Sequence, residues 1–257
     1  EELRSLIKEK AKEMGYEASE TPVQVKNKSY TIGVIVAERY VKEYPSFYME
    51  IYKCIAQEAT KRGNMTILEV AGEKKEKLEQ EFNTFQDIDI AGIIIIGEMN
   101  RDYVNEVKKV LDLPIVCVDF YDVSGDIDYI VTDNFGGMEQ MTEILLKAGC
   151  EDLIFVGTPQ ATGSIMDRYL GFTKAMTKWK KKVDPAHVIP DRDENRYSYK
   201  IDVEVPEKLP DGFVCNCDKA AKTLLYKLQE RGVSIPEDVS IVSFDHYYSQ
   251  VQSGMEL

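Results

Sequence analysis

Residues 236–245 read PEDVSIVSFD, a short β-branched run that ends in Phe244 and Asp245. We expect a strand over residues 239–244 that delivers the Asp245 carboxylate to its own carboxyl end. In open α/β sheets, ligands bind outside the carboxyl ends of the strands. This stretch therefore predicts both a sheet and a binding position at its edge.

The rest of the chain alternates similar apolar runs with segments of helical periodicity. The other predicted strands are residues 30–37, 65–70, 92–96, 114–120, 129–132, 153–157 and 213–216. Three apolar stripes at helical spacing are Phe47-Ile51-Ile55-Ala59, Met138-Met141-Leu145-Ala148 and Ala221-Leu224-Leu225-Leu228. Gly63, Gly149 and Gly232 follow these stripes, where a left-handed helix cap favours glycine. The pattern predicts an α/β protein whose parallel sheets are doubly wound, with helices on both faces.

Length and composition indicate a soluble globular protein of two lobes. The chain has 257 residues, of which 44% are hydrophobic and 30% are charged. No apolar run approaches the roughly 18 residues that a membrane helix needs, and the charged start Glu1-Glu2-Leu3-Arg4 does not resemble a secretory signal. The five cysteines are odd in number and lack metal-site spacing, which favours reduced thiols. We therefore expect a cytoplasmic protein.

The formal net charge of -13 argues against nucleic-acid binding by this chain alone. Duplex binding depends on Lys and Arg side chains that neutralise several phosphates. The one dense basic cluster, residues 178–182, ends an amphipathic segment, where cations complement the helix dipole. Any contact with DNA must come from a small basic part.

The sequence lacks the usual signatures of cofactor, metal and hydrolase sites. No Gly-x-Gly-x-x-Gly or Gly-x-x-x-x-Gly-Lys-Ser/Thr follows a predicted strand, and no Gly-x-Ser-x-Gly occurs. The two histidines, His187 and His246, are far apart and have no metal-ligand set near them. We therefore predict no cofactor, no metal and no catalytic residues. Polar groups at strand ends favour binding over catalysis.

Seven motifs occur in a fixed order along the chain. They are TIGVIV (31–36), PSFY (45–48), AGIII (91–95), LPIV (113–116) leading to Asp119, VTDNFGG (131–137), RYLGF (168–172) and VSIPEDVS (233–240) with the following Phe244-Asp245. In this order they resemble the effector-binding core of the lactose-repressor/galactose-repressor family of bacterial transcription regulators. The family shares the fold of periplasmic sugar-binding proteins. The resemblance implies two doubly wound, parallel-sheet lobes of that type, which close on an effector.

The resemblance also implies a division of the chain. Residues 1–16 would end a DNA-binding headpiece, 17–29 would be a hinge or linker, 30–135 the N-terminal lobe, 136–245 the C-terminal lobe and 246–257 a truncated crossover back to the first lobe. A native protein of this kind should continue upstream, unless it is a headless paralogue, and family members run on past Leu257. The linker reads ASETPVQV (18–25), whose Pro22 and valines suit an extended segment better than the family's hinge helix. A leucine that wedges open the DNA minor groove is absent from it.

Individual residues of the effector pocket follow from the same resemblance. Arg168 would hydrogen-bond ligand hydroxyls or a carboxylate, and Asp245 and Asp119 would accept hydrogen bonds from hydroxyls. Phe47 and Tyr48 could stack on a sugar ring. The alternatives are a surface ion pair for Arg168, a helix N-cap for Asp245 and a core position for Phe47.

Cys217 departs from the family pattern within this predicted pocket. The chain reads Asn216-Cys217-Asp218, whereas family members usually have Ala-Asn-Asp, whose asparagine reaches the ligand. A thiol is a poorer donor and acceptor than an amide, so a hydroxyl-rich ligand loses a partner. Asn216 could compensate if the loop is shifted, and a catalytic thiol at Cys217 is disfavoured because no histidine lies near it in the sequence.

The predicted function is that of a ligand-sensing domain in a bacterial transcription regulator. It would bind a sugar or another small metabolite between its lobes, form a homodimer and control operator DNA through a headpiece mostly absent from this chain, without membrane association. One alternative is a periplasmic-type sugar-binding protein for transport, which would need an export signal. The other is an enzyme on a doubly wound sheet, which would need a cofactor motif or clustered acid and base groups.

Overall fold

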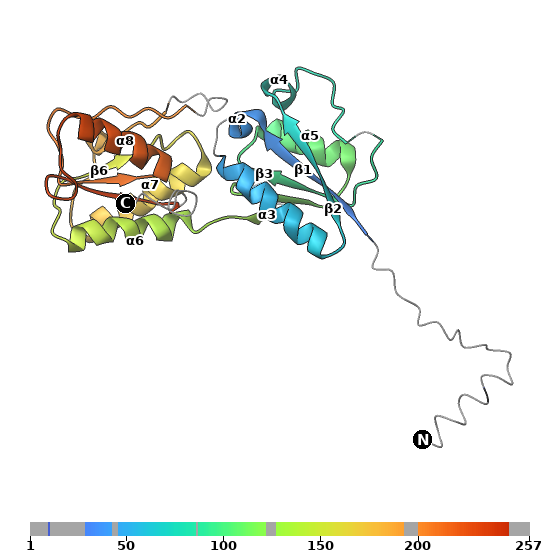
Figure 1. Ribbon diagram of the computed structural model, residues 1–257, viewed down its shortest axis with the longest axis horizontal. Helices are drawn as coiled ribbons and strands as arrows, with labels where there is room; N and C mark the ends of the chain where they lie inside the picture. Colours follow the sequence, from blue (N-terminus) through green and yellow to red (C-terminus); the bar gives the residue numbers. More distant parts are fainter. Residues whose placement is uncertain are drawn as a thin grey trace.

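The computed structural model of the chain describes residue 10 and residues 29–42, 46–85, 87–121, 127–192 and 200–246. The predicted headpiece end (1–16), linker (17–29) and truncated crossover (246–257) lie outside the described residues, apart from Lys10, Ser29 and His246. The chain forms two lobes that lie side by side (Figure 1). The boundary at residue 135 stays a prediction.

The first lobe is built on a five-stranded parallel sheet in the order β2-β1-β3-β4-β5. Its strands are β1 (Thr31–Ala37), β2 (Met65–Ala71), β3 (Gly92–Ile96), β4 (Ile115–Val118) and β5 (Asp128–Ile130). Its helices are α2 (Glu38–Val41), α3 (Phe47–Lys61), α4 (Glu73–Glu76) and α5 (Arg101–Leu111). The order 2-1-3-4-5 reverses direction between β1 and β3, which is where doubly wound sheets place ligands.

The second lobe repeats this plan with a four-stranded parallel sheet in the order β7-β6-β8-β9. Its strands are β6 (Leu153–Val156), β7 (Val188–Ile189), β8 (Gly212–Cys215) and β9 (Ser240–Ser243). Its helices are α6 (Asn134–Lys147), α7 (Gly163–Lys178), α8 (Asp218–Glu230) and the short 3-10 helix η1 (Pro185–His187). This sheet changes direction between β6 and β8.

The second sheet is covered on both faces. Leu153 and Phe155 of β6 lie in one apolar cluster with side chains of α6 and α7, such as Met138 and Phe172. The alternate β6 residues Ile154 and Val156 belong to a second cluster, with Leu224 and Leu228 of α8. Because neighbouring side chains of a strand point to opposite faces, one strand supplies both layers of the core. The predicted α/β class is therefore confirmed.

The predicted strands match the observed ones in position, with shorter ends in several cases. The prediction for residues 114–120 covers β4, which spans only Ile115–Val118, because Asp119 already has a left-handed backbone (φ 67°). The prediction at residues 239–244 corresponds to β9. The two-residue strand β7 had not been predicted, because a run this short carries no readable alternation. Gly63, Gly149 and Gly232 have φ values of 74°, 99° and 73°, as expected of left-handed caps.

A glycine in α7 brings two helices of the second lobe close together. A Cβ atom added at Gly171 would lie 2.2 Å from the carbonyl oxygen of Phe135 in α6. The neighbour is backbone, so rotation of a side chain cannot relieve the overlap. Gly171 therefore allows the first turn of α6 to approach α7, three residues after Arg168.

No helix among the described residues is long and apolar enough to cross a membrane.

The close approach of α6 and α7 predicts a large effect from a small substitution. Gly171→Ala should lower the free energy of unfolding by about 1–3 kcal/mol, because the added methyl group forces the two helices apart. Thr177→Ala, at an exposed position of the same helix, is the matched control. Urea denaturation of both variants measures the difference. Equal stability of Gly171→Ala and the wild type would show that the helices do not pack this closely.

Candidate functional site

The predicted site residues lie at the carboxyl ends of strands or in the helices that follow them. Asp119 follows β4, Cys217 follows β8, and Asp245 follows β9 shortly after the strand ends. Phe47 and Tyr48 begin α3, and Arg168 lies in the second turn of α7. Ser164 Oγ of α7 donates to the carbonyl oxygen of Asp119 at 3.1 Å, so the two lobes meet at this edge.

Arg168 is held by groups from several elements of the second lobe. Its Nε donates to Oδ1 of Asn134 at 2.8 Å, and its Nη1 donates to the carbonyl oxygen of Asn216 at 2.6 Å. Nη1 is also 3.3 Å from Oδ1 of Asp245, and the guanidinium carbon lies 4.0 Å from the ring centroid of Phe244. The residue is only 8% exposed, which rules out the surface ion pair considered from the sequence. Its orientation is therefore fixed before any ligand binds.

The structure brings Asp245 beside Arg168. Burial raises the pKa of the Asp245 carboxyl group to about 6, although the positive charge of Arg168 opposes the shift. The negative charges of Asp218 and Asp119 raise this pKa further, and a hydrogen bond from the backbone N–H of Asp218 lowers it. Asp218 is the first residue of α8, so Asp245 accepts a hydrogen bond at that helix end, although the N-cap residue of α8 is Cys217.

Asp119 faces the same charged group from the first lobe. The hydroxyl of Tyr48 donates to its Oδ2 at 3.0 Å. Burial raises the pKa of Asp119, against the opposing effects of Arg168 and of the Tyr48 hydrogen bond. A left-handed backbone is uncommon for a residue other than glycine and concentrates at functional positions, so the φ of 67° at Asp119 fits such a place.

The two aromatic candidates differ in what they contact. Tyr48 is 8% exposed and packs on Tyr40 with ring centroids 4.2 Å apart. A Cβ atom at Gly97 would lie 2.6 Å from the ring of Tyr40 and 2.9 Å from that of Tyr48, so glycine is needed beneath this pair. Phe47 meets Tyr48 edge-on at 5.3 Å and packs against the core of the first lobe. The core alternative for Phe47 therefore has direct support, and ligand stacking by either ring stays a prediction.

Cys217 is buried at the N-cap of α8, and its side chain makes no capping hydrogen bond. Nη2 of Arg192 lies 3.9 Å from its sulfur. Burial raises the pKa of the thiol to about 12, more than the nearby Arg192 lowers it. The group is therefore a neutral thiol at physiological pH and a weak nucleophile.

The side-chain amide of Asn216 does not take the position that the family's asparagine would occupy near Arg168. Its Nδ2 donates to the carbonyl oxygen of Val156 at 3.0 Å and to Oδ2 of Asp191 at 2.8 Å. These contacts turn the amide group toward the interior of the second lobe. Its Oδ1 is buried and has no hydrogen-bond partner among the described residues.

A buried polar cluster behind Cys217 had not been predicted from the sequence. Asp191 is fully buried and accepts hydrogen bonds from Arg192, Asn216 and the backbone N–H of Thr158. These bonds hold the pKa of its carboxyl group below the usual value, against the opposing effect of burial. The signal was weak because Asp191 follows β7, the strand too short to detect.

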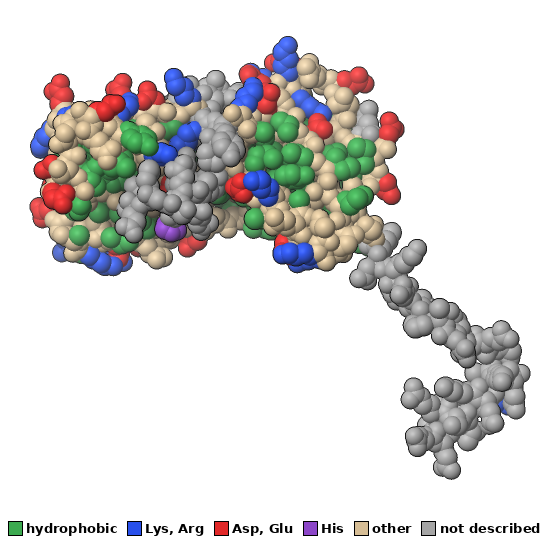
Figure 2. All heavy atoms as spheres, in the orientation of Figure 1, with side chains coloured by type: hydrophobic (Ala, Val, Ile, Leu, Met, Phe, Trp, Pro, Cys, Tyr) green, Lys and Arg blue, Asp and Glu red, His purple; other side chains and the backbone are tan. Residues whose placement is uncertain are grey.

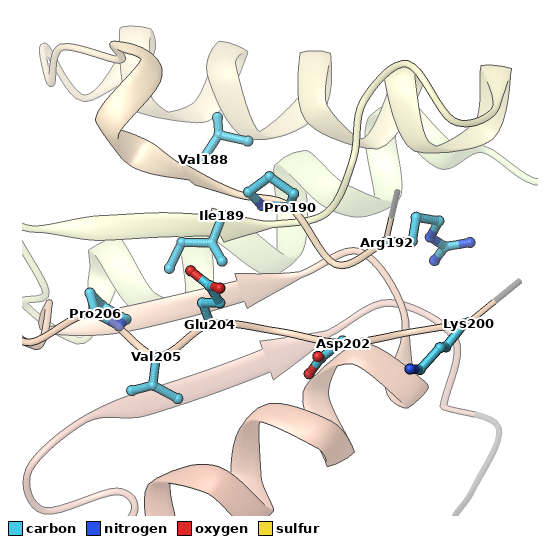
Figure 3. A pocket seen from close by; sticks show the side chains of 9 residues that line it. All are labelled: Val188, Ile189, Pro190, Arg192, Lys200, Asp202, Glu204, Val205 and Pro206. Atoms are coloured by element: carbon cyan, nitrogen blue, oxygen red, sulfur yellow. The ribbon is translucent and has the colours of Figure 1, made fainter. Parts of the chain in front are cut away.

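A separate pocket of about 650 Å³ lies at the outer edge of the second sheet (Figure 3). Val188, Ile189 and Pro190 line one side, and the extended segment of residues 200–206 lines the other. Arg168, Asp119 and Asp245 are not among its lining residues. This pocket is therefore distinct from the candidate site between the lobes.

Charged side chains of both signs are mixed on the face shown in Figure 2. Within the described part of the chain, no cluster of histidine, cysteine and carboxylate side chains could hold a metal ion. The basic residues near 178–182 lie at the end of α7, as expected of a helix terminus. Lys178 pairs there with Glu139 and Glu143, so part of its charge is already neutralised.

Comparisons with known proteins agree with this geometry. The family described as "Periplasmic binding protein-like domain" matches residues 142–253. The HTH-type transcriptional regulator RegA of Clostridium saccharobutylicum is 25% identical over 255 residues, which cover 97% of this chain and 75% of RegA.

Solved structures show the same fold. The transcription regulator CcpA of Lactococcus lactis aligns with a TM-score of 0.68 and 20% identity, over 88% of this chain and 82% of that one. A periplasmic binding protein/LacI transcriptional regulator from Alkaliphilus metalliredigens, solved with D-xylulofuranose, aligns with a TM-score of 0.64 and 23% identity over the same shares. The resemblance and the fold class predicted from the sequence are confirmed, and these relatives are regulators rather than enzymes.

The raised pKa of Asp245 predicts a pH-dependent stability. The folded-state pKa of about 6 lies above the ordinary aspartate value of 3.8, so ionisation of this group destabilises the fold as the pH rises from about 4 to above 6. Asp245→Asn cannot ionise. The melting temperature of this variant, relative to that of the wild type, should therefore be higher at pH 7.5 than at pH 4.5.

Thermal melts across this pH range measure the difference. Asp128→Asn, on the exposed edge strand β5, serves as the matched control. A difference between Asp245→Asn and the wild type that stays constant with pH would mean that Asp245 titrates as an ordinary surface carboxylate.

Proposed function

Because the chain matches the effector-binding core of the lactose-repressor/galactose-repressor family along nearly its whole length, we propose that it senses a small molecule bound between its two lobes. The effector would be a sugar or another hydroxyl-rich metabolite. In a chain that also carries a DNA-binding headpiece, its binding would control the occupancy of operator DNA. The protein would act as a homodimer, since operators are read as paired half-sites.

The observation that carries this proposal is the set of hydrogen-bonding positions left open around Arg168. Nε and Nη1 of Arg168 are engaged, whereas Nη2 has no hydrogen-bond partner among the described residues. Within the same part of the chain, Oδ1 of Asp119 also lacks one, since Tyr48 engages only Oδ2. A fixed cationic donor near carboxylate acceptors can bind adjacent hydroxyl groups of one ligand.

The charge of the site favours a ligand that is not strongly anionic. Asp119, Asp218 and Asp245 act together on the potential around Arg168, and the pKa of Asp245 is raised in part by the other two. Arg168 is already neutralised in part by Asp245. A phosphate or a second carboxylate would add to this negative charge, whereas a neutral polyol would donate to the acidic oxygens without repulsion.

The proposed mechanism is a shift between open and closed arrangements of the lobes. Asp119 and Tyr48 belong to the first lobe, and Arg168 and Asp245 belong to the second. A ligand that contacts both groups binds the closed arrangement more tightly, so it raises the population of that state. The same reasoning applies to any effector that spans the two sets of residues.

A thermal-shift screen of sugars, sugar phosphates and purines tests the proposal. A neutral sugar should raise the melting temperature of the wild type, and this increase should be largely lost in Arg168→Gln, because the substitution removes the cationic donor. Arg62→Ala, at the exposed C-cap of α3, is the control and should keep the full increase. Each increase is measured against the same variant without ligand, which corrects for any loss of stability.

Two outcomes would contradict the proposal. Equal stabilisation of the wild type and Arg168→Gln would place the ligand elsewhere. Chemical conversion of the bound sugar by the pure protein, followed by mass spectrometry, would indicate an enzyme.

A further inference from the structure

The first turn of α7 is the part of the second lobe to which the first lobe attaches. Oε2 of Glu98, in the loop after β3, accepts a hydrogen bond from the backbone N–H of Gly163 at 2.7 Å. The hydroxyl of Tyr121 donates to the carboxylate of Asp167 at 3.0 and 3.1 Å. With the bond from Ser164 to Asp119, three residues of the first lobe, in the loops after β3 and β4, contact the start of α7.

The contact made by Glu98 has a favourable electrostatic setting. Gly163 is the first residue of α7, so its N–H has no partner within the helix. A carboxylate at this position satisfies the donor and interacts with the positive end of the helix dipole. Thr162 serves as the N-cap of the same helix and accepts from the N–H of Ile165, so Glu98 complements the local cap without competing with it.

Buried groups of the first lobe hold Glu98 in place. Arg39 donates to the carbonyl oxygen of Glu98 and forms an ion pair with Glu76, with 9% and 2% of the two side chains exposed. Tyr40 donates to the same carbonyl oxygen at 2.9 Å. Glu76 also accepts from the backbone N–H of Asn100 at 2.7 Å, so residues on both sides of Met99 are fixed.

We propose that the arrangement of the lobes described here is the closed one, and that Glu98 is a latch that stabilises it through the first turn of α7, with Arg39 and Glu76 as its positioning residues. The latch acts on the helix that carries Arg168, whose hydrogen bonds and ion pair to other described residues lie within the second lobe. It therefore sets how often the closed state forms without effector. A strong latch reduces the free energy that the effector must supply for closure.

This inference rests on lobe closure as the proposed mechanism, but its test needs no effector. Spin labels on the exposed Cys54 of α3 and on a cysteine introduced by Glu230→Cys in α8 report the distance between the lobes. The measurement is double electron–electron resonance in a Cys150→Ser background. A screen that finds no stabilising ligand would contradict the proposed function, whereas an unchanged distance between the lobes in the Glu98 variant would contradict only the latch.

Removal of the carboxylate should open the lobes. In Glu98→Ala the ratio of closed to open molecules should fall about tenfold, the size expected for a lost charge-assisted hydrogen bond. Glu98→Gln keeps an acceptor oxygen without the charge and should give a smaller fall. Tyr121→Phe should also give a smaller fall, because Tyr121 is 47% exposed and its bond to Asp167 competes with water.

A matched control and a second variant separate the latch from a general loss of stability. Glu79→Ala removes an exposed carboxylate of the first lobe, and its distance distribution should equal that of the wild type. Glu76→Gln weakens the support of Glu98 and should open the lobes in the same direction as Glu98→Ala. An unchanged distribution in Glu98→Ala, or an equal shift in Glu79→Ala, would overturn the proposal.

Discussion

The buried guanidinium group of Arg168 is the interaction on which the candidate site depends. It joins α7 to Asn134, the first residue of α6, and to Asn216, which follows β8. It also contacts Phe244 and Asp245, which follow β9. A cation removed from water needs partners on most sides, and here carbonyl, amide, carboxylate and aromatic groups supply them. The carboxyl end of the second sheet is therefore organised around one charge.

This arrangement requires close packing of the elements that carry it. Gly171 allows α6 to approach α7, so Asn134 can accept from Arg168. In the first lobe, Gly97 makes room for the tilted, closely packed rings of Tyr40 and Tyr48, and Tyr48 in turn donates to Asp119. Both glycines lie outside the proposed contacts with the effector, yet each determines where a neighbouring polar side chain points.

The two lobes differ in how their polar groups are employed. In the second lobe, the cluster of Asp191, Arg192 and Asn216 is satisfied largely within the lobe and supports the strand ends from behind. In the first lobe, the ion pair of Arg39 and Glu76 holds the loop after β3. The side chain of Glu98 in this loop accepts a hydrogen bond from the second lobe. Buried charge thus gives rigidity in one lobe and a defined contact between lobes in the other.

The sequence by itself determined the α/β class, the positions of most strands along the chain and the placement of Asp119 and Asp245 at strand ends. These features depend on local periodicity, glycine caps and short motifs, all of which act between residues near one another in the chain. It also indicated Arg168 as a candidate site residue and Cys217 as a departure from the family pattern, because both lie in motifs that the family resemblance makes readable.

Only the tertiary structure decided what these residues contact. The open Nη2 of Arg168, the inward turn of Asn216 and the reach of Glu98 to Gly163 depend on groups that are 25 to 65 residues apart in the chain. Such pairings carry no local signal, because they arise from the packing of whole helices and from the need of each buried polar group for a partner.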